Sequence, residues 1–256
     1  MNLYVDVISD VICPWCFIGK RRLERAVSDY EKPVRVRWHP FQLNPAMPKE
    51  GISRKEYRIG KFGSWERSME LDANIVAVGK QEGIHFDFDR MERTPNTLDA
   101  HRLIWLSDKE VIQVAVVEAL FLAYFTDGQD LSNQQTLIEE VAEAGIDRKR
   151  AEATLNSYEG IDAFKEAGEQ ARRFRVDSVP FFIVNSEITL AGAQSPDVFV
   201  DAFKQGWCRF RLLLHTKPSQ VAYFSQLSLA KYRPSNLVTG VPVSLPLKSI
   251  HLRITP

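Results

Sequence analysis

The stretch Cys13-Pro14-Trp15-Cys16 follows an alternating, β-rich segment at residues 2–8 and precedes apolar residues at helical spacing. At the start of a helix, residues i and i+3 face the same side, so two sulfurs at this spacing can reach disulfide-bonding distance. The free backbone N–H groups there favour the thiolate form of the first sulfur, and Pro14 suits the first turn. We therefore expect Cys13 to be exposed and nucleophilic, and Cys16 to be shielded and to resolve a mixed disulfide.

Two other roles are open to a close cysteine pair. Half of a zinc site is one, but such a site needs two more Cys or His ligands at suitable spacing. The third cysteine, Cys208, stands alone, and the five histidines show no paired spacing. The other role is that of buried structural cysteines, which the position between a strand and a helix disfavours. We predict a redox-active pair and no metal site.

The remaining segments fit an α/β fold around this pair. Alternation at residues 34–38 predicts a second strand, followed by a proline-containing loop at residues 39–45. An apolar run at residues 180–184, with a partner at 187–191, predicts a hairpin, and Ser195-Pro196 opens a final helix. Between them lies a long helical block. The order is typical of a thioredoxin-like fold with a large all-helical insertion.

We divide the chain into three parts. A discontinuous thioredoxin-like domain comprises residues 1–50 and 160–206, and a helical insertion domain comprises residues 51–159. Its strongest helical pattern, Lys109 to Phe125, predicts an apolar face formed by Val111, Val114, Ala115, Leu120 and Leu122. Residues 207–256 form a basic tail with five prolines and no sustained period, which we expect to be poorly ordered.

Composition restricts the class of partner. The chain has 256 residues, 33 basic and 33 acidic side chains and no net charge, so we expect no nucleic-acid partner. No segment approaches a membrane span, and the N-terminus lacks the pattern of a secretory signal. Three cysteines are too few for a disulfide scaffold. We expect a soluble, cytoplasmic protein without a membrane partner.

The motifs together resemble a known family. With the cysteine pair after the first strand, Ser178-Val179-Pro180 before a late strand and a helical insertion, the chain resembles the DsbA-like thioredoxin superfamily. It is more similar still to the FrnE-like branch over about residues 1–206, on four blocks: Pro40-Phe41-Gln42-Leu43-Asn44-Pro45, Pro95-Asn96-Thr97, Ala100-His101-Arg102-Leu103 and Gly192-Ala193-Gln194.

The resemblance implies roles for further residues. Pro180 is expected to follow a cis peptide bond and to pack beside the cysteines, with the Val179 backbone available for pairing with a substrate peptide. Phe41, Asn96 and His101 are candidates for substrate binding, although packing, an N-cap and a structural histidine are simpler roles for them. Together with Pro14 and Trp15, these residues complete the expected active site.

These features predict a thiol–disulfide oxidoreductase or isomerase, acting on disulfide-containing proteins or on small-molecule thiols, as a monomer or homodimer. No bound cofactor is expected, and glutathione is a candidate co-substrate. DsbA has His where this chain has Trp15, so we expect a milder oxidant. The alternative is a glutathione-dependent transferase or isomerase of the kappa or 2-hydroxychromene-2-carboxylate isomerase type, which typically has Ser in place of Cys13. A chaperone-like binding module is a third, non-enzymatic reading.

Overall fold

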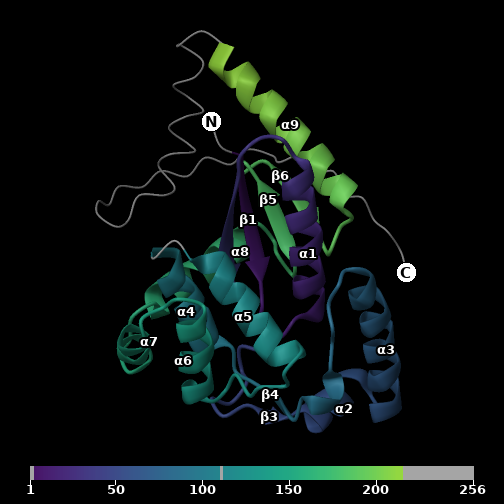
Figure 1. The fold of residues 1–256 in the computed structure, drawn as a ribbon, viewed down its shortest axis with the longest axis vertical. Helices are drawn as coiled ribbons and strands as arrows, with labels where there is room; N and C mark the ends of the chain where they lie inside the picture. Colours follow the sequence, from purple (N-terminus) through teal and green to yellow (C-terminus); the bar gives the residue numbers. More distant parts are fainter. Residues whose placement is uncertain (1–2, 110–111, 216–256) are drawn as a thin grey trace.

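A four-stranded mixed sheet forms the centre of the computed structural model, which describes residues 3–109 and 112–215 (Figure 1). The strand order is β2-β1-β5-β6, with β1 parallel to β2 and antiparallel to β5. The strands are β1 (Leu3–Ser9), β2 (Val34–Pro40), β5 (Phe181–Val184) and β6 (Ile188–Ala191). β2 runs two residues beyond the predicted end, because His39 and Pro40 continue the parallel pairing with β1.

Helices cover both faces of this sheet (Figure 1). Val5 and Val7 belong to the core cluster that includes residues of α1 (Pro14–Asp29) and α9 (Pro196–His215). Ile8 faces the other way and clusters with Ala171 of α8 (Ile161–Arg173). β1 is buried on both faces, which explains why most of its residues are apolar. The fold is thioredoxin-like, as predicted.

The last helix passes the predicted boundary at residue 206. α9 continues to His215, and Trp207 is half-buried, with the Lys32 ammonium 4.3 Å from the centroid of its indole. The tail was predicted to begin at residue 207 because its five prolines and lack of a sustained period disfavour a helix. The first of these prolines is Pro218, however, so residues 207–215 can continue α9. Residues 216–256, the rest of the predicted tail, lie outside the described residues.

The insertion lies at the carboxyl ends of β1 and β2, with α4 to α7 grouped on one side and α2 and α3 on the other (Figure 1). Two short strands, β3 (Ile52–Ser53) and β4 (Arg93–Thr94), pair with each other in the insertion. The sequence did not predict them, because two residues are too few to produce a recognisable pattern. The helices are α2 (Arg54–Phe62), α3 (Trp65–Gln81), the 3₁₀ turn η1 (Phe88–Arg90), α4 (Leu98–Lys109), α5 (Gln113–Phe125), α6 (Gln134–Glu143) and α7 (Arg148–Leu155).

The apolar face predicted for residues 109–125 is wrong. α4 ends at Lys109 and α5 begins at Gln113, so the segment is not one helix, and Val111 lies outside the described residues. Val114 and Leu122 are 43% and 37% exposed, whereas Leu120 is fully buried. Nearly every residue of α5 is apolar, so periodicity could not identify the face that packs.

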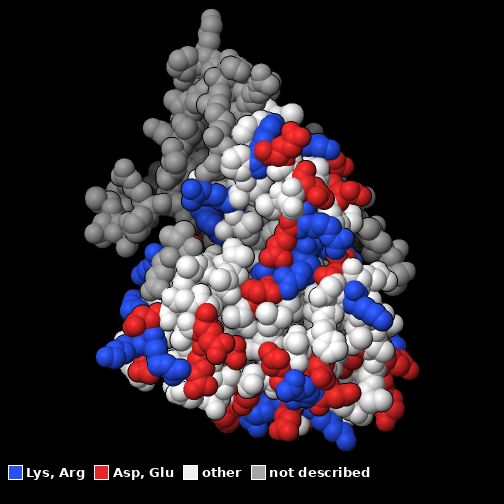
Figure 2. Space-filling view, in the orientation of Figure 1, with Lys and Arg blue, Asp and Glu red and all other residues white. Residues whose placement is uncertain are grey.

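Two kinds of contact join α1 to α5 of the insertion. The rings of Phe17 and Phe121 stack with centroids 5.0 Å apart, and both side chains are fully buried. The buried ammonium of Lys20 pairs with Glu118, which also accepts a 2.9 Å hydrogen bond from the Arg21 guanidinium. Elsewhere, positive and negative side chains are interspersed over the face that Figure 2 displays.

Two leucines of α5 test which of its faces packs. Leu120→Ala should lower the free energy of unfolding by about 3 kcal/mol, because it leaves a cavity in the core. Leu122→Ala is the matched control and should change it by about 0.5 kcal/mol, since Leu122 is partly exposed. Urea denaturation measures both values. Equal losses would contradict the observed face.

Candidate active site

The cysteine pair lies at the first turn of α1. Cys13 is the N-cap residue, Pro14 occupies the first turn, and the Cys16 N–H donates to the Cys13 carbonyl at 2.9 Å. Both cysteines are free thiols. A backbone leaving an extended strand and entering a helix at Pro14 thus places the two side chains one turn apart, as the sequence predicts.

Cys13 is less exposed than expected. It is only 6% exposed, whereas the neighbouring Trp15 is 40% exposed. The prediction of an exposed sulfur is wrong because the late loop at Val179 covers it: the Cys13 thiol donates to the Val179 carbonyl, with Sγ and oxygen 3.5 Å apart. A substrate can instead approach Cys13 through a cavity that this residue lines.

The Val179–Pro180 peptide bond is cis, which confirms the expectation from the resemblance. Pro180 is buried, and its carbonyl accepts a 2.8 Å hydrogen bond from the Gly192 N–H. α1 approaches this loop closely at Gly19, where a Cβ would lie 3.1 Å from both Pro180 Cγ and Phe182 Cζ. Glycine at this position therefore lets α1 pack directly against the proline loop.

Cys16 is completely buried. Burial raises the pKa of the Cys16 thiol well above its ordinary value, and the neighbouring Cys13 raises it further. Hydrogen bonding from the Ser9 side chain and the Asp10 backbone acts in the opposite direction and is the weaker influence. Cys16 is therefore a protonated thiol at neutral pH, shielded as predicted.

A cavity of about 430 Å³ lies between the cysteine motif and the insertion. Cys13, Pro14 and Trp15 form one wall. Much of the opposite wall is aromatic or aliphatic and comes from four elements of the insertion: α2, α3, η1 and α5. This space is large enough for a small organic molecule with the Cys13 sulfur at one side.

Three cations of α2 line this cavity: Arg54, Arg58 and Lys61. Asp72 of α3 pairs with Arg54 at 2.6 Å and with Arg58 at 2.5 Å, and burial lowers the pKa of Arg58. One carboxylate among three cations leaves a net positive wall. Sequence reasoning missed these residues, although their spacing of four and three residues places them on one helix face.

A buried tyrosine closes the same cavity. Tyr124 of α5 lines it, and its hydroxyl donates to the Arg93 carbonyl at 3.2 Å. Burial raises the pKa of Tyr124, which stays a neutral phenol at neutral pH. Tyr124 therefore contributes an uncharged aromatic surface to the cavity wall and adds no negative charge to it.

Phe41, Asn96 and His101 do not line the large cavity. Phe41 packs against the apolar cluster that Ile8 forms with Ala171 of α8. The Asn96 side chain accepts from the Leu98 N–H at 3.0 Å at the start of α4, which is a capping interaction. His101 is 2% exposed and contacts Asp10 and the Phe41 carbonyl. The geometry gives all three residues structural contacts.

The described residues contain no group of three or more His, Cys, Asp or Glu side chains that could hold a metal ion. In the same part of the chain, none of the helices combines the length and apolarity that crossing a membrane requires.

The fold and the site together define a class. A strand followed by a Cys-x-x-Cys helix start, with a cis-proline loop against the first sulfur, is the arrangement of a thioredoxin-like protein. A family model described as a DSBA-like thioredoxin domain matches residues 4–204. The chain belongs to this family.

Known proteins that are similar to this chain include the following three. The uncharacterized protein YwbO of Bacillus subtilis is 26% identical over 206 residues, which are 79% of this chain and 96% of YwbO. A probable DsbA oxidoreductase of Streptomyces coelicolor, SCO1869, superposes with a TM-score of 0.76 at 26% identity, covering 84% of this chain and 92% of that structure. The cytosolic disulfide reductase DsbM of Pseudomonas aeruginosa with GSH shares the fold, with a TM-score of 0.58 at 20% identity. The superposition covers 80% of this chain and 99% of the DsbM chain.

Alkylation tests the difference between the two cysteines. In a Cys208→Ser background, Cys16→Ser should leave Cys13 reactive toward iodoacetamide at neutral pH, since Cys13 lines the cavity. Cys13→Ser should leave Cys16 unmodified at neutral pH, because burial and a raised pKa keep it a protected thiol. Mass spectrometry of the native protein measures both. Rapid modification of Cys16 near pH 7 would contradict the shielding.

Proposed function

We propose that this chain is a thiol–disulfide oxidoreductase or isomerase that uses the Cys13-Pro14-Trp15-Cys16 site. The supporting observation is the position of the Cys13 sulfur, at the start of α1, 3.5 Å from the Val179 carbonyl and open to the large cavity. A sulfur there is oriented by the loop, lies at the N-terminus of a helix and is accessible to a substrate disulfide. The FrnE-like motif blocks support placing the chain in that branch.

The different surroundings of Cys13 and Cys16 determine the order of steps in the thiol–disulfide exchange. The Cys13 thiolate attacks a sulfur of the substrate disulfide, and the other substrate sulfur leaves as a thiolate. Cys16 then attacks the Cys13 sulfur of the mixed disulfide, so that the Cys13–Cys16 disulfide forms and the second substrate sulfur leaves. The substrate gains two electrons and the cysteine pair loses them. The reverse sequence oxidises a dithiol.

The large cavity favours small-molecule disulfides or thiols beside protein substrates. Its net positive wall of Arg54, Arg58 and Lys61 would attract a carboxylate-bearing thiol. Glutathione has this chemistry and is our candidate co-substrate, and DsbM with GSH shares the fold. For proteins, the Val179 backbone offers an edge for an extended peptide. We assign the activity to the cytoplasm, in a monomer or homodimer without a bound cofactor.

The alternative activity, a glutathione-dependent transfer or isomerisation of the kappa or 2-hydroxychromene-2-carboxylate isomerase type, rests on the same cavity. Its walls are largely apolar, and a positive side would hold glutathione while an apolar second substrate fills the remainder. Such a reaction needs one activated sulfur, and it gives Cys16 no role. The completely buried second cysteine directly behind Cys13 therefore favours the redox reaction.

Activity assays on cysteine variants separate these reactions. Cys13→Ser should reduce insulin reduction and the isomerisation of scrambled ribonuclease to background, because no attacking sulfur remains. Cys16→Ser should stop turnover and accumulate a mixed disulfide at Cys13, which mass spectrometry detects. Redox activity that survives Cys13→Ser would refute the proposal. Glutathione conjugation that is intact without Cys16 would favour the transferase.

The reduction potential tests the contribution of Trp15. The neutral indole supplies no charge to a thiolate, so the potential should lie below the roughly −120 mV of DsbA. Trp15→His should raise it by about 30 mV, since a cationic ring stabilises the reduced form by about tenfold. The control Tyr158→His changes an exposed aromatic residue outside the cavity and should have no effect. Equilibration with glutathione measures each value; a parent as oxidising as DsbA would contradict the expectation.

A further inference from the structure

The resolving step needs a route for a proton. Cys16 has no exposed surface, and its pKa is raised by burial, so it enters the step as a thiol. Its sulfur can attack the mixed disulfide only after this proton has left. The Ser9 side chain, itself buried, neighbours the Cys16 sulfur and acts to lower its pKa, and with Cys16 fully buried bulk water does not reach this thiol directly.

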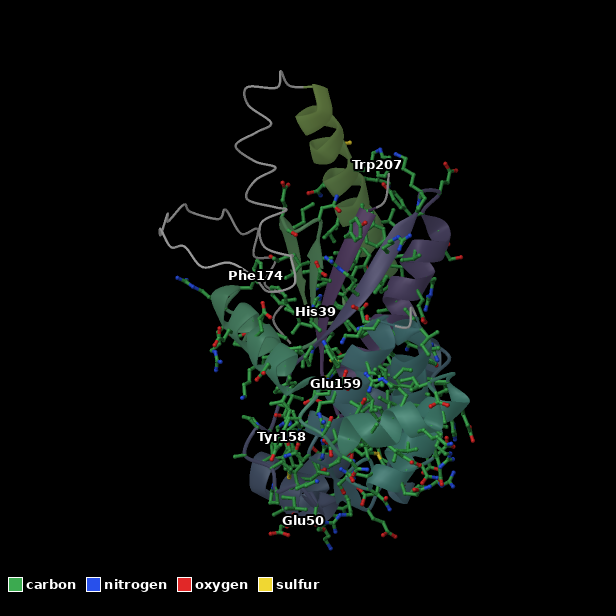
Figure 3. All side chains as sticks on the ribbon, turned by 90° about the vertical axis from the view of Figure 1, so that its left-hand side faces the viewer. His39, Glu50, Tyr158, Glu159, Phe174 and Trp207 are labelled. Carbon is green, nitrogen blue, oxygen red and sulfur yellow. The ribbon has the colours of Figure 1, made fainter. Side chains whose placement is uncertain are left out.

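Ser9 lines a second, small cavity, which shares no lining residue with the large one. Its volume is about 10 Å³, which is room for one water molecule. Polar side chains contribute to its wall from three elements: Ser9 of β1, Trp38 and His39 of β2, and His101 of α4. Figure 3 shows His39 where β2 reaches the helices of the insertion. Apolar side chains complete the lining.

Two buried polar atoms of this lining have no hydrogen-bond partner among the described residues: Trp38 Nε1 and His101 Nδ1. Indole Nε1 is a donor. The other ring nitrogen of His101, Nε2, lies 3.2 Å from Asp10 Oδ1 and 3.1 Å from the Phe41 carbonyl oxygen. Both of these are acceptors, so the hydrogen-bond network assigns the proton to Nε2 and leaves Nδ1 as a lone-pair acceptor.

We propose that this cavity holds one water molecule, and that His101 accepts the proton of Cys16 through it. Trp38 Nε1–H donates to the water, and the water donates to His101 Nδ1. The Ser9 hydroxyl, which lines this cavity and neighbours Cys16, would connect the water to the Cys16 sulfur. The inference rests on the proposed redox function and assigns the proton of its resolving step. His101 is thus a proton-relay residue, and it does not touch the substrate.

The step balances as follows. The Cys16 thiol gives its proton to the Ser9 oxygen as the hydroxyl passes its own proton to the water, and the water passes one to His101 Nδ1. The resulting imidazolium is stabilised by the Asp10 carboxylate, which is completely buried. The Cys16 sulfur then bonds to the Cys13 sulfur, and the bond between Cys13 and the substrate sulfur breaks, with its electron pair leaving on the substrate thiolate.

The nearby charged groups support a specific role for His101. Asp10 Oδ2 accepts from the Leu43 N–H at 2.7 Å, which fixes the carboxylate, and its Oδ1 faces His101. His39 lines the same cavity, but its Nε2 pairs with Asp6 at 2.8 Å, and Asp6 also pairs with Arg37. The two histidines therefore have separate carboxylate partners, and among the described residues His101 is the histidine with a buried ring nitrogen that lacks a hydrogen-bond partner.

Single-turnover release of thiol from dithiobis(nitrobenzoate) tests the relay. One equivalent is added to the reduced full chain carrying Cys208→Ser. The first thiol reports attack by Cys13, and the second reports resolution by Cys16. His101→Gln should leave the first phase unchanged and slow the second about 10²-fold, the usual contribution of a proton acceptor. The second phase should then rise about tenfold per pH unit, because hydroxide becomes the acceptor, while the parent shows a flatter profile.

Two further variants make the result specific. Ser9→Ala should also slow the second phase alone, whereas His39→Gln, the matched control in the same cavity, should leave both phases at the parent rates. An unchanged second phase in His101→Gln, equal slowing of both phases, or equal slowing by His39→Gln would overturn the relay. A parent that releases no first thiol would instead overturn the proposed function, so the two failures are distinguishable.

Discussion

The contact between the start of α1 and the Val179–Pro180 loop is the constraint on which the site depends. It joins the Cys13 sulfur to a carbonyl 166 positions later in the sequence. The antiparallel pairing of β1 with β5 makes this possible, because α1 follows one strand and the loop precedes the other. Gly19 then allows the close approach. The reactive sulfur is thus held by the sheet, and the helix alone would not fix its position.

The insertion turns this sulfur site into a cavity. Without α2, α3 and α5, Cys13 and Trp15 would face open solvent beside the loop. The Phe17–Phe121 stack and the Lys20–Glu118 pair fix the insertion to α1, the same helix that begins with the cysteines. Helices of the insertion therefore form the cavity wall that faces the cysteines, while the cysteine motif itself belongs to the thioredoxin-like part.

Local signals predicted what depends on local geometry. The Cys-x-x-Cys spacing and the alternating strands require only neighbouring residues, and the cis bond at Pro180 came from the resemblance. The burial of Cys13 could not be foreseen, because a loop distant in sequence covers it. The packed face of α5 was missed because almost all its residues are apolar. The spacing of Arg54, Arg58 and Lys61 on α2 can be read from the sequence, but only the fold shows that they line the same cavity as Cys13.

The residues around Asp10 show that the insertion contributes to the surroundings of the cysteine pair. Asp10 is completely buried three residues before Cys13, and a buried carboxylate needs hydrogen-bond donors. One donor is the Leu43 backbone and the other is His101 on α4, so the carboxylate joins the β1 end to the insertion. A chain reduced to the thioredoxin-like segments would leave this carboxylate with the Leu43 N–H and without its contact to His101. The family fold and its insertion are therefore coupled by electrostatics as well as by packing.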